Sequence, residues 1–443
     1  MIKLEHTNSL NGTLAVPGDK SISHRSVMIG AIAEGDTYVR GFLDGEDCRA
    51  TIDCFEKMGI EVEDKFGPSS HFPEAREDER ILVVHGNGLR GLKEPAQILD
   101  ARNSGTTVRL LSGILAGQSF VSTITGDDSL KTRPMGRIIR PLNYMGVMCA
   151  TVGNDEKLPM TIFGGGVHSI RYENHIASAQ VKSCVLLAGL YAEEPTFYTE
   201  PVLSRNHTEL MLGSFGGNIK VRNRHDEPGV TTILYPGTIL TGQDVFVPGD
   251  ISSAAYFLAA GLITKDSEIT LKGVGINETR DGILRVIRAM GGHLNVTNVR
   301  MEGQEAVADL TVRSSELKAT QIGGAIIPAL IDEIPVIAVM AACAKGTTVI
   351  RDAAELKVKE SDRLSGIVHN LRRMGCYVEE TDDGMRIQGG HLCGARIDPR
   401  GDHRMAMAFS IAGLAAEGST TIADESCVNI SYPSFYEDLY RLS

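Results

Sequence analysis

The sequence predicts an α/β (α+β) protein with two domains, each built from repeated units of alternating helices and strands. Three observations carry this prediction. The chain has 443 residues, which is more than one ordinary hydrophobic core accommodates. Pairs of a large apolar residue and a glycine recur along the chain at the ends of amphipathic stretches. The tetrapeptide Val-Pro-Gly-Asp occurs twice, at residues 16–19 and 247–250.

The first half of each predicted unit is an Ala-rich helix that ends at a glycine and leads into a β-branched strand. This pattern occurs at residues 31–39, 115–124, 341–350 and 415–422. Glycine is the usual residue just past a helix end, and β-branched residues favour strands. Each segment is therefore expected to fold as a helix followed by a strand.

The second half of each unit is an amphipathic helix closed by a large apolar residue and a glycine. The pairs are Met58-Gly59, Met145-Gly146, Phe215-Gly216, Met290-Gly291 and Met374-Gly375. A short stretch of alternating apolar and polar residues follows each pair, which predicts a strand. About six such units fit into the chain length.

The sixth unit is cut short at Ser443, whereas residues 2–16 supply strand sequence with no helix of their own. We expect the two ends of the chain to complete one another. One discontinuous domain would then comprise residues 1–20 and 248–443, and the other residues 21–247. The hinges would lie near 17–20 and 247–250, where Pro-Gly turns can absorb changes in backbone angles.

Composition excludes several functional classes. A formal net charge of −12 argues against nucleic acid as a partner, because such binding depends on neutralising phosphates. The eight cysteines show no zinc-site spacing, so we expect reduced, mostly buried thiols and no metal. No apolar run is long enough for a membrane span, and the start of the chain lacks a signal-peptide pattern. We therefore expect a cytoplasmic protein that does not bind a membrane.

The first Val-Pro-Gly-Asp copy continues with basic and hydroxyl residues, whereas the second does not. Lys20, Ser21 and Arg25 follow the first turn at a predicted helix start. A helix N-terminus has unpaired N–H groups that favour anions, and Lys20 and Arg25 add full charges. A capped helix start is the simpler explanation for such a string in isolation.

Further polar segments have the same design. Gly105 lies in the sequence Asn-Ser-Gly-Thr-Thr before an apolar helix, and Ser178 and Gln180 open another helix. Capping explains either pattern taken alone. Arg133 precedes a proline, which holds it extended, and Arg205 lies in a polar loop of the next unit. Both arginines suit a carboxylate or phosphate, although a solvated arginine gives the same pattern.

The C-terminal half contributes a second charged group. Lys359, Glu360 and Arg363 lie just before a strongly amphipathic helix, for which Ser361 is a plausible N-cap. Glu360 lies between cations and could act as an acid.

Two further residues of this half stand out. Arg404 occupies the first turn of another helix, where a cation is unfavourable unless an anion binds. Asp332 interrupts an apolar segment. It suits a general base for a hydroxyl, although buried helix caps give the same pattern.

In their order and combination, these motifs resemble the 5-enolpyruvylshikimate-3-phosphate (EPSP) synthases, or 3-phosphoshikimate 1-carboxyvinyltransferases. The resemblance covers essentially the whole chain, and residues 205–209 and 277–280 are similar to signatures of the class II branch. It implies a monomer of two domains, each an inverted α/β barrel of three βαβαββ units, with no cofactor. The implied reaction transfers the enolpyruvyl group of phosphoenolpyruvate to the 5-hydroxyl of shikimate 3-phosphate, on the route to chorismate.

The resemblance also implies roles for individual residues. Asp332 would be the general base, and Glu360 with Lys20 would move the protons at the methylene carbon. The implied shikimate 3-phosphate contacts are Lys20, Ser21, Arg25, Ser178, Gln180, Arg205, Asp332 and Lys359. The implied phosphoenolpyruvate contacts are Lys20, Gly105, Arg133, Gln180, Arg363 and Arg404. Many class I members carry a lysine in the stretch that is 429–433 here, so one such contact is expected to be missing.

Two other interpretations stay open. An enolpyruvyl transferase acting on UDP-N-acetylglucosamine has the same architecture but usually carries a loop cysteine. Residues 126–133 contain no cysteine, and Lys20 is followed by serine where that enzyme has asparagine. A non-catalytic phospholigand-binding relative would bind the same molecules without turnover.

Overall fold

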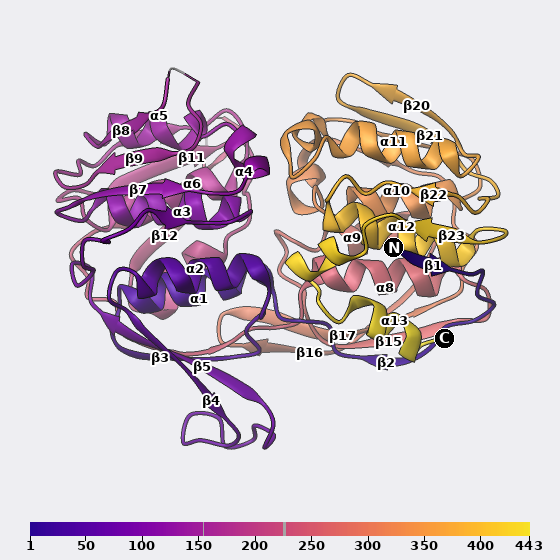
Figure 1. Cartoon of the computed structure of the whole chain (residues 1–443), viewed down its shortest axis with the longest axis horizontal. Helices are drawn as coiled ribbons and strands as arrows, with labels where there is room; N and C mark the ends of the chain where they lie inside the picture. The colour runs from indigo at the N-terminus through magenta and orange to yellow at the C-terminus, as the bar shows by residue number, and fades with distance from the viewer. Residues whose placement is uncertain (154, 225–226) are drawn as a thin grey trace. The chain divides into compact units, whose positions relative to one another are not determined.

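The computed structural model describes residues 1–153, 155–224 and 227–443 (Figure 1). Its contacts divide the chain into two compact units. Unit 1 comprises Met1–Pro17 and Pro248–Ser443, and unit 2 comprises Gly18–Val247. The first boundary, between Pro17 and Gly18, lies three residues before the expected one. Lys20 therefore belongs to unit 2, where it begins the first helix.

Unit 2 contains three four-stranded sheets with the same strand pattern. In each sheet an edge strand pairs in parallel with the second strand, which pairs antiparallel with the third, and the third pairs antiparallel with the fourth. The sheets are β14 (Asp244–Phe246), β3 (Glu34–Arg40), β5 (Arg80–Asn87), β4 (Glu61–Phe66); β6 (Leu99–Asp100), β7 (Val121–Thr125), β9 (Met160–Phe163), β8 (Met148–Thr151); and β10 (Arg171–Glu173), β11 (Thr196–Glu200), β13 (Val230–Tyr235), β12 (Asn218–Asn223).

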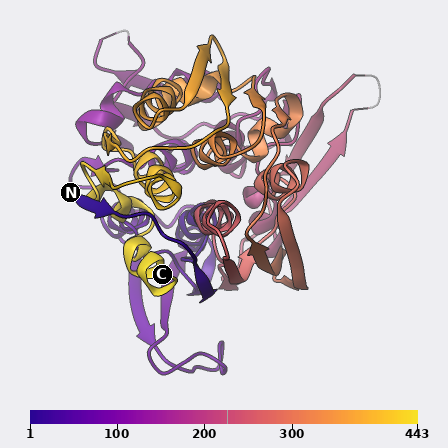
Figure 2. The same ribbon diagram turned by 90° about the vertical axis from the view of Figure 1, so that its right-hand side faces the viewer.

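Unit 1 repeats this arrangement, with one shortened sheet. Its sheets are β2 (Asn11–Leu14), β15 (Glu268–Gly275), β17 (Glu305–Arg313), β16 (His293–Glu302); β18 (Gln321–Ile322), β19 (Thr347–Ile350), β21 (Gly384–Gln388), β20 (Tyr377–Thr381); and β22 (Arg396–Ile397), β23 (Thr420–Ile422), β1 (Ile2–Leu4). The N-terminal strand β1 pairs antiparallel with β23, and both are labelled in Figure 1. Figure 2 shows β1 as the indigo arrow beside the N label. The prediction that the chain ends complete the sixth repeat is confirmed.

The helices fall into two groups in each unit. The first are buried on nearly all sides: α1 (Lys20–Ala31), α3 (Gly105–Ala116) and α6 (Ala179–Gly189) in unit 2, and α8 (Ile251–Ile263), α10 (Ile334–Ala342) and α12 (His403–Ala415) in unit 1. The others are α2 (Glu46–Glu56), α4 (Asp128–Thr132), α5 (Gly136–Tyr144), α7 (His207–Ser214), α9 (Gly282–Ala289), α11 (Arg363–Arg373), α13 (Phe435–Arg441) and the 3₁₀ helices Gly324–Ala329, Ala354–Val358 and Ser426–Ile430. With the sheets, this is the predicted α/β architecture of repeated βαβαββ units.

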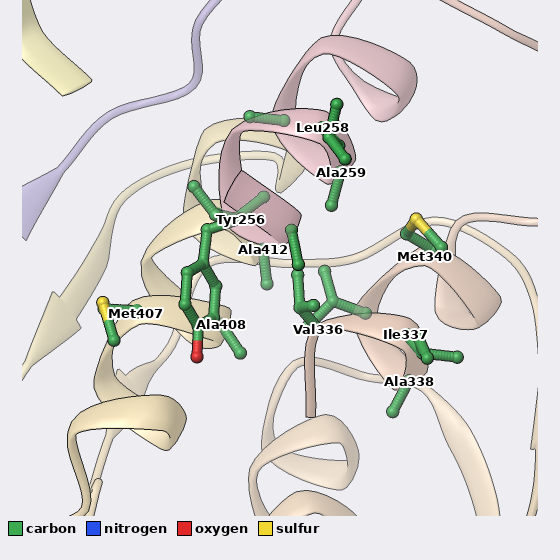
Figure 3. Close-up of a cluster of buried hydrophobic side chains, with 14 of the residues drawn as sticks. Tyr256, Leu258, Ala259, Val336, Ile337, Ala338, Met340, Met407, Ala408 and Ala412 are labelled. Carbon is green, nitrogen blue, oxygen red and sulfur yellow. The ribbon is translucent and has the colours of Figure 1, made fainter. Parts of the chain in front are cut away.

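The core of unit 1 forms where its three buried helices meet. Figure 3 shows Tyr256 and Leu258 of α8, Val336 of α10 and Ala408 and Ala412 of α12 in one cluster. All five side chains are almost completely buried. The alanine side chains on the facing helices are small, so the helices can approach closely and pack without voids.

The glycines that close the outer helices adopt the backbone conformation that their role requires. Gly59, Gly146, Gly216, Gly291 and Gly375 all have φ between 77° and 94°. Only glycine adopts this left-handed region without strain. The prediction of helix ends at these five positions is confirmed.

One glycine of the first pattern differs. Gly117 has φ −86°, so it does not terminate its helix in the left-handed conformation. A Cβ atom at this position would lie 2.0 Å from Cγ of Tyr191. Close packing against that ring, rather than a special backbone angle, therefore requires the glycine.

The cysteines of the described chain are all free thiols, and most of them are buried. Burial raises the pKa of Cys54 and of Cys343 to about 12, so these thiols stay protonated at neutral pH. Within the described residues, no helix is long and apolar enough to cross a membrane.

Candidate active site

Five of the predicted substrate-binding residues of unit 2 lie at the N-terminal ends of its buried helices: Lys20 and Ser21 at α1, Gly105 at α3, and Ser178 and Gln180 at α6. Helix α1 begins at Lys20, and its N-cap is Asp19, whose carboxylate accepts from the Ile22 N–H at 2.9 Å. The junction is therefore a capped helix start, with Asp19 as the cap, and the Ser21 hydroxyl does not fill that position. The Lys20 ammonium lies 2.9 Å from Oδ2 of Asp47.

Arg25 is buried and joins three helices through its guanidinium. Nε donates to Oγ1 of Thr208 in α7 at 2.7 Å, and Nη2 donates to Oγ of Ser183 in α6 at 2.9 Å. Nη1 donates to the carbonyl of Ser21 at 2.9 Å. Arg205 lies half-buried in the loop before α7, three residues from Thr208. The folded chain thus brings Ser21, Arg25 and the Arg205 loop into one neighbourhood.

The starts of α3 and α6 meet around Gly105. Ser104 caps α3 by accepting from the Thr107 N–H at 3.1 Å, so the capping interpretation holds for that serine. Arg109 donates from Nη1 to Oε1 of Gln180 at 2.6 Å. A Cβ atom on Gly105 would lie 3.1 Å from Nη1 of Arg109 and 3.5 Å from Nη1 of Arg133. Two guanidinium groups, those of Arg109 and Arg133, therefore lie beside this one position.

Arg133 is held as its position before Pro134 predicts. Its backbone is extended, with φ −77° and ψ 138°. Its Nη2 donates to Oδ1 of Asn103 at 2.6 Å, and the side chain is buried. A buried, oriented guanidinium is suited to bind a carboxylate or a phosphate, whereas a solvated arginine is excluded at this position.

Ser178 occupies the N-cap position of α6 without making a side-chain cap hydrogen bond. Its carbonyl accepts from the Tyr198 hydroxyl at 3.4 Å. Ser178 therefore stands at the N-cap position, but its hydroxyl does not make the hydrogen bond that the capping explanation requires.

In unit 1, the second charged group surrounds Asp332, just before α10. Asp332 Oδ1 lies 3.4 Å from Nζ of Lys359 and 3.4 Å from Nη1 of Arg363, and Oδ2 lies 3.9 Å from Nη2 of Arg404. The Asp332 side chain is only 12% exposed. Three cations from different segments therefore surround one carboxylate.

Arg363 also pairs with two further carboxylates. Its Nη2 donates to Oε2 of Glu360, and its Nε donates to Oδ2 of Asp402 at 2.8 Å. Ser361 donates to the same Asp402 oxygen at 3.0 Å, and the cap of α11 is Asp362. The prediction of Ser361 as N-cap is wrong, because the helix starts one residue later.

The three cations face the carboxylates of Asp332, Glu360 and Asp402, and Glu355 adds a fourth carboxylate at 3.7 Å from Nζ of Lys359. Burial by itself lowers the pKa of Arg363, but the Asp402 and Glu360 carboxylates outweigh it and raise the pKa above the usual value. Burial likewise opposes the charge of Arg404, and the Asp332 carboxylate dominates the rise of its pKa. Arg404 is therefore stabilised at its helix start by a carboxylate of the protein itself, which corrects the expectation that only a bound anion could do so.

The sequence-predicted residues thus form two sets. Unit 2 holds Lys20, Ser21, Arg25, Gly105, Arg133, Ser178, Gln180 and Arg205, and unit 1 holds Asp332, Lys359, Glu360, Arg363 and Arg404. Sequence reasoning missed Arg109 and the role of Asp402. An arginine four residues after Gly105, inside an otherwise apolar helix, is the signal that could have revealed Arg109. Within the described chain, no cluster of His, Cys, Asp and Glu is suited to hold a metal ion.

Known proteins are similar to this chain in sequence and in fold over almost its whole length. The family model of EPSP synthase (3-phosphoshikimate 1-carboxyvinyltransferase) matches residues 4–439. A 3-phosphoshikimate 1-carboxyvinyltransferase of Thermoanaerobacter sp. is 52% identical over 98% of both chains. One of Geobacillus kaustophilus is 48% identical over 99% of both chains. The solved EPSP synthase of Acinetobacter baumannii superposes with a TM-score of 0.84 at 43% identity, covering 100% of this chain and 98% of its own. By sequence and by fold, the chain belongs to the EPSP synthase family.

Proposed function

We propose that this protein transfers the enolpyruvyl group of phosphoenolpyruvate to the 5-hydroxyl of shikimate 3-phosphate and releases phosphate. The observation that carries the proposal is that oriented cations gather in each unit: Arg25, Arg109 and Arg133 in unit 2, and Lys359, Arg363 and Arg404 around the Asp332 carboxylate in unit 1. Both substrates carry a carboxylate and a phosphate, so binding requires several fixed cations. Guanidinium groups that are already oriented bind such anionic groups without a rearrangement of the protein, and backbone N–H groups at helix starts add hydrogen bonds.

In this proposal each residue binds one of the two substrates, except Lys20 and Gln180, which bind both. Lys20, Ser21, Arg25, Ser178, Gln180, Arg205, Asp332 and Lys359 bind shikimate 3-phosphate. Lys20, Gly105, Arg133, Gln180, Arg363 and Arg404 bind phosphoenolpyruvate. The contacts of Arg109 with Gln180 and beside Gly105 add it to the second group.

Addition starts with Asp332 as the general base. Its carboxylate takes the proton of the 5-hydroxyl, and the oxygen forms a bond to C2 of phosphoenolpyruvate. Glu360, together with Lys20, supplies a proton to C3, which gives a tetrahedral intermediate. Lys359 and Arg363, each with a nitrogen 3.4 Å from Oδ1 of Asp332, hold this carboxylate in place before the transfer.

Elimination then reverses the proton transfer at C3. The base that gave the proton takes one back, the C2–C3 double bond re-forms, and the C2–O bond to phosphate breaks. Phosphate leaves with the electron pair of that bond. The buried cations offset the negative charge that builds on the leaving group.

The test is release of phosphate from phosphoenolpyruvate with each acceptor offered separately. We expect turnover with shikimate 3-phosphate and none with UDP-N-acetylglucosamine. Asp332→Asn and Glu360→Gln are expected to lower kcat by at least about a hundredfold, the usual contribution of one general acid or base.

The matched control is Asp438→Asn. Asp438 is also a buried carboxylate, but it contacts Tyr432, Ser434 and Arg441 of the C-terminal segment, and the variant should keep its rate. Binding of shikimate 3-phosphate without turnover in the wild-type protein would instead favour a non-catalytic relative.

We further propose a cytoplasmic monomer that needs no cofactor. Light scattering is expected to give a mass near 47.7 kDa. Activity is expected to survive exhaustive dialysis against a chelator. A dimer mass, or loss of activity on dialysis that added metal restores, would contradict these two statements.

A further inference from the structure

A buried ion cluster joins helices α6 and α7 to strand β11 in unit 2. It consists of Lys182 in α6, Glu200 at the end of β11 and Glu209 in α7, whose side chains are 0%, 1% and 4% exposed. The Lys182 ammonium lies 2.8 Å from Oε1 of Glu200 and 2.7 Å from Oε1 of Glu209. Burying charges is costly, and a buried charge that loses its partner strongly destabilises a protein. Moving these three side chains apart would therefore be unfavourable, which holds them in fixed positions.

The cluster binds both peptide groups of Ser204, the residue directly before Arg205. Glu200 Oε1 accepts from the Ser204 N–H at 3.0 Å, and the Lys182 ammonium donates to the Ser204 carbonyl at 3.0 Å. Hydrogen bonds to charged partners are stronger than those between neutral groups. The backbone that carries Arg205 is therefore fixed by two buried charges within a loop that has no strand or helix of its own.

Neighbours of the cluster support two other substrate-binding residues. Thr208, adjacent to Glu209, accepts the hydrogen bond from Nε of Arg25 at 2.7 Å. Tyr198 lies two residues before Glu200 on the same buried face of β11, and its hydroxyl donates to the Ser178 carbonyl at 3.4 Å. The elements that hold the cluster thus also hold Arg25 and Ser178.

We propose that Lys182, Glu200 and Glu209 are positioning residues for shikimate 3-phosphate, and that they act through Arg205. The inference rests on the proposed function, because that function assigns Arg205, Arg25 and Ser178 to this substrate. The cluster keeps Arg205 in its binding orientation before the substrate arrives. The substrate then loses less affinity to ordering the loop.

The first test is the affinity of Glu200→Ala for shikimate 3-phosphate, measured by calorimetry without phosphoenolpyruvate. Alanine removes the acceptor of the Ser204 N–H and one partner of Lys182. We expect the Kd to rise at least about tenfold, the loss expected for one charged hydrogen bond. The KM for phosphoenolpyruvate at saturating shikimate 3-phosphate is expected to change less than about twofold. A Kd within about twofold of wild type would overturn the proposal.

A second variant, Glu200→Gln, guards against failure of the alanine variant to fold. Its side chain keeps an oxygen that can accept from the Ser204 N–H but loses the charge. We expect a smaller rise in Kd, about threefold, so the conservative variant restores part of the binding. If Glu200→Ala does not fold, an unchanged Kd for Glu200→Gln contradicts the proposal.

The decisive test combines Glu200→Ala with Arg205→Ala. If the cluster acts through Arg205, the double variant should bind no more than about twofold more weakly than Arg205→Ala alone. Independent, additive losses would overturn the proposal. Asp438→Asn serves as the control, since it removes a buried charge of unit 1 and should leave the Kd unchanged.

Failure of the inference and failure of the proposed function give different results. A wild-type protein that releases no phosphate with shikimate 3-phosphate contradicts the proposed function. A wild-type protein that turns over normally, with both Glu200 variants binding shikimate 3-phosphate as tightly, contradicts only the positioning role.

Discussion

Asp402 is the residue whose loss should most disturb the charged group of unit 1. Its carboxylate is fully buried, accepts from Nε and Nη2 of Arg363 at 2.8 and 3.3 Å, and accepts from Ser361 at 3.0 Å. It also caps α12 by accepting from the Arg404 N–H at 2.9 Å. Asp402→Ala removes all four interactions and leaves a fully buried guanidinium without one of its carboxylates.

The size of the effect follows from the burial of this pair. Removing one partner of a buried ion pair costs about 3–5 kcal/mol. A domain of 150–250 residues loses about 2–4 °C in Tm per kcal/mol, and unit 1 falls in that range. We therefore expect the transition of unit 1 to fall by at least about 6 °C in a calorimetric scan. The kcat/KM for phosphoenolpyruvate should fall at least about tenfold, because Arg363 and Arg404 are displaced.

The matched control is Asp362→Ala. Asp362 is also the N-cap of a unit 1 helix and accepts from the Ser365 N–H at 3.0 Å, but it is exposed and has no buried partner. It should cost only about 1 kcal/mol, the usual value of a helix cap. If Asp402→Ala lowers the transition no more than Asp362→Ala does, the argument from the buried ion pair is refuted.

Two further predictions concern unit 2. Gly105→Ala places a Cβ atom 3.1 Å from Nη1 of Arg109, which cannot move without disturbing its bond to Gln180, so we expect a severalfold higher KM for phosphoenolpyruvate. The Kd for shikimate 3-phosphate should rise by a smaller factor, because Gln180 is only one of its proposed contacts; an unchanged KM would show that Arg109 moves aside without loss. Burial, with Lys20 and Arg25 nearby and Asp19 opposing them, lowers the pKa of His24 well below 6.5, so the folded state binds its proton less readily than the unfolded state. Stability should therefore fall as pH drops below about 6.5, by at most about 1.4 kcal/mol per pH unit from this group, and Tm measured against pH should fall less steeply in His24→Gln; equal slopes would contradict the argument.

The fold follows from local sequence signals to an unusual extent. The five glycines after the outer helices have positive φ, a property of the single residue, and the repeat of helix and strand patterns follows from periodicity. The pairing of β1 with β23 was also predictable, because the sixth repeat lacks a strand that residues 2–16 supply. Gly117 shows what local signals do not predict. A glycine is needed there because the ring of Tyr191, which lies far along the chain, packs against it.

Within the candidate site, the sequence by itself determined which residue types lie at helix starts, because capping and turn patterns are local. It did not determine their partners. Asp402 bonds Arg363 across 39 residues, and Arg109 bonds Gln180 across 71 residues. Only the packing of the buried helices decides such distances, since it brings separate N-termini together. The tertiary structure therefore turned candidates that were individually no better than helix caps into two buried, charged sets.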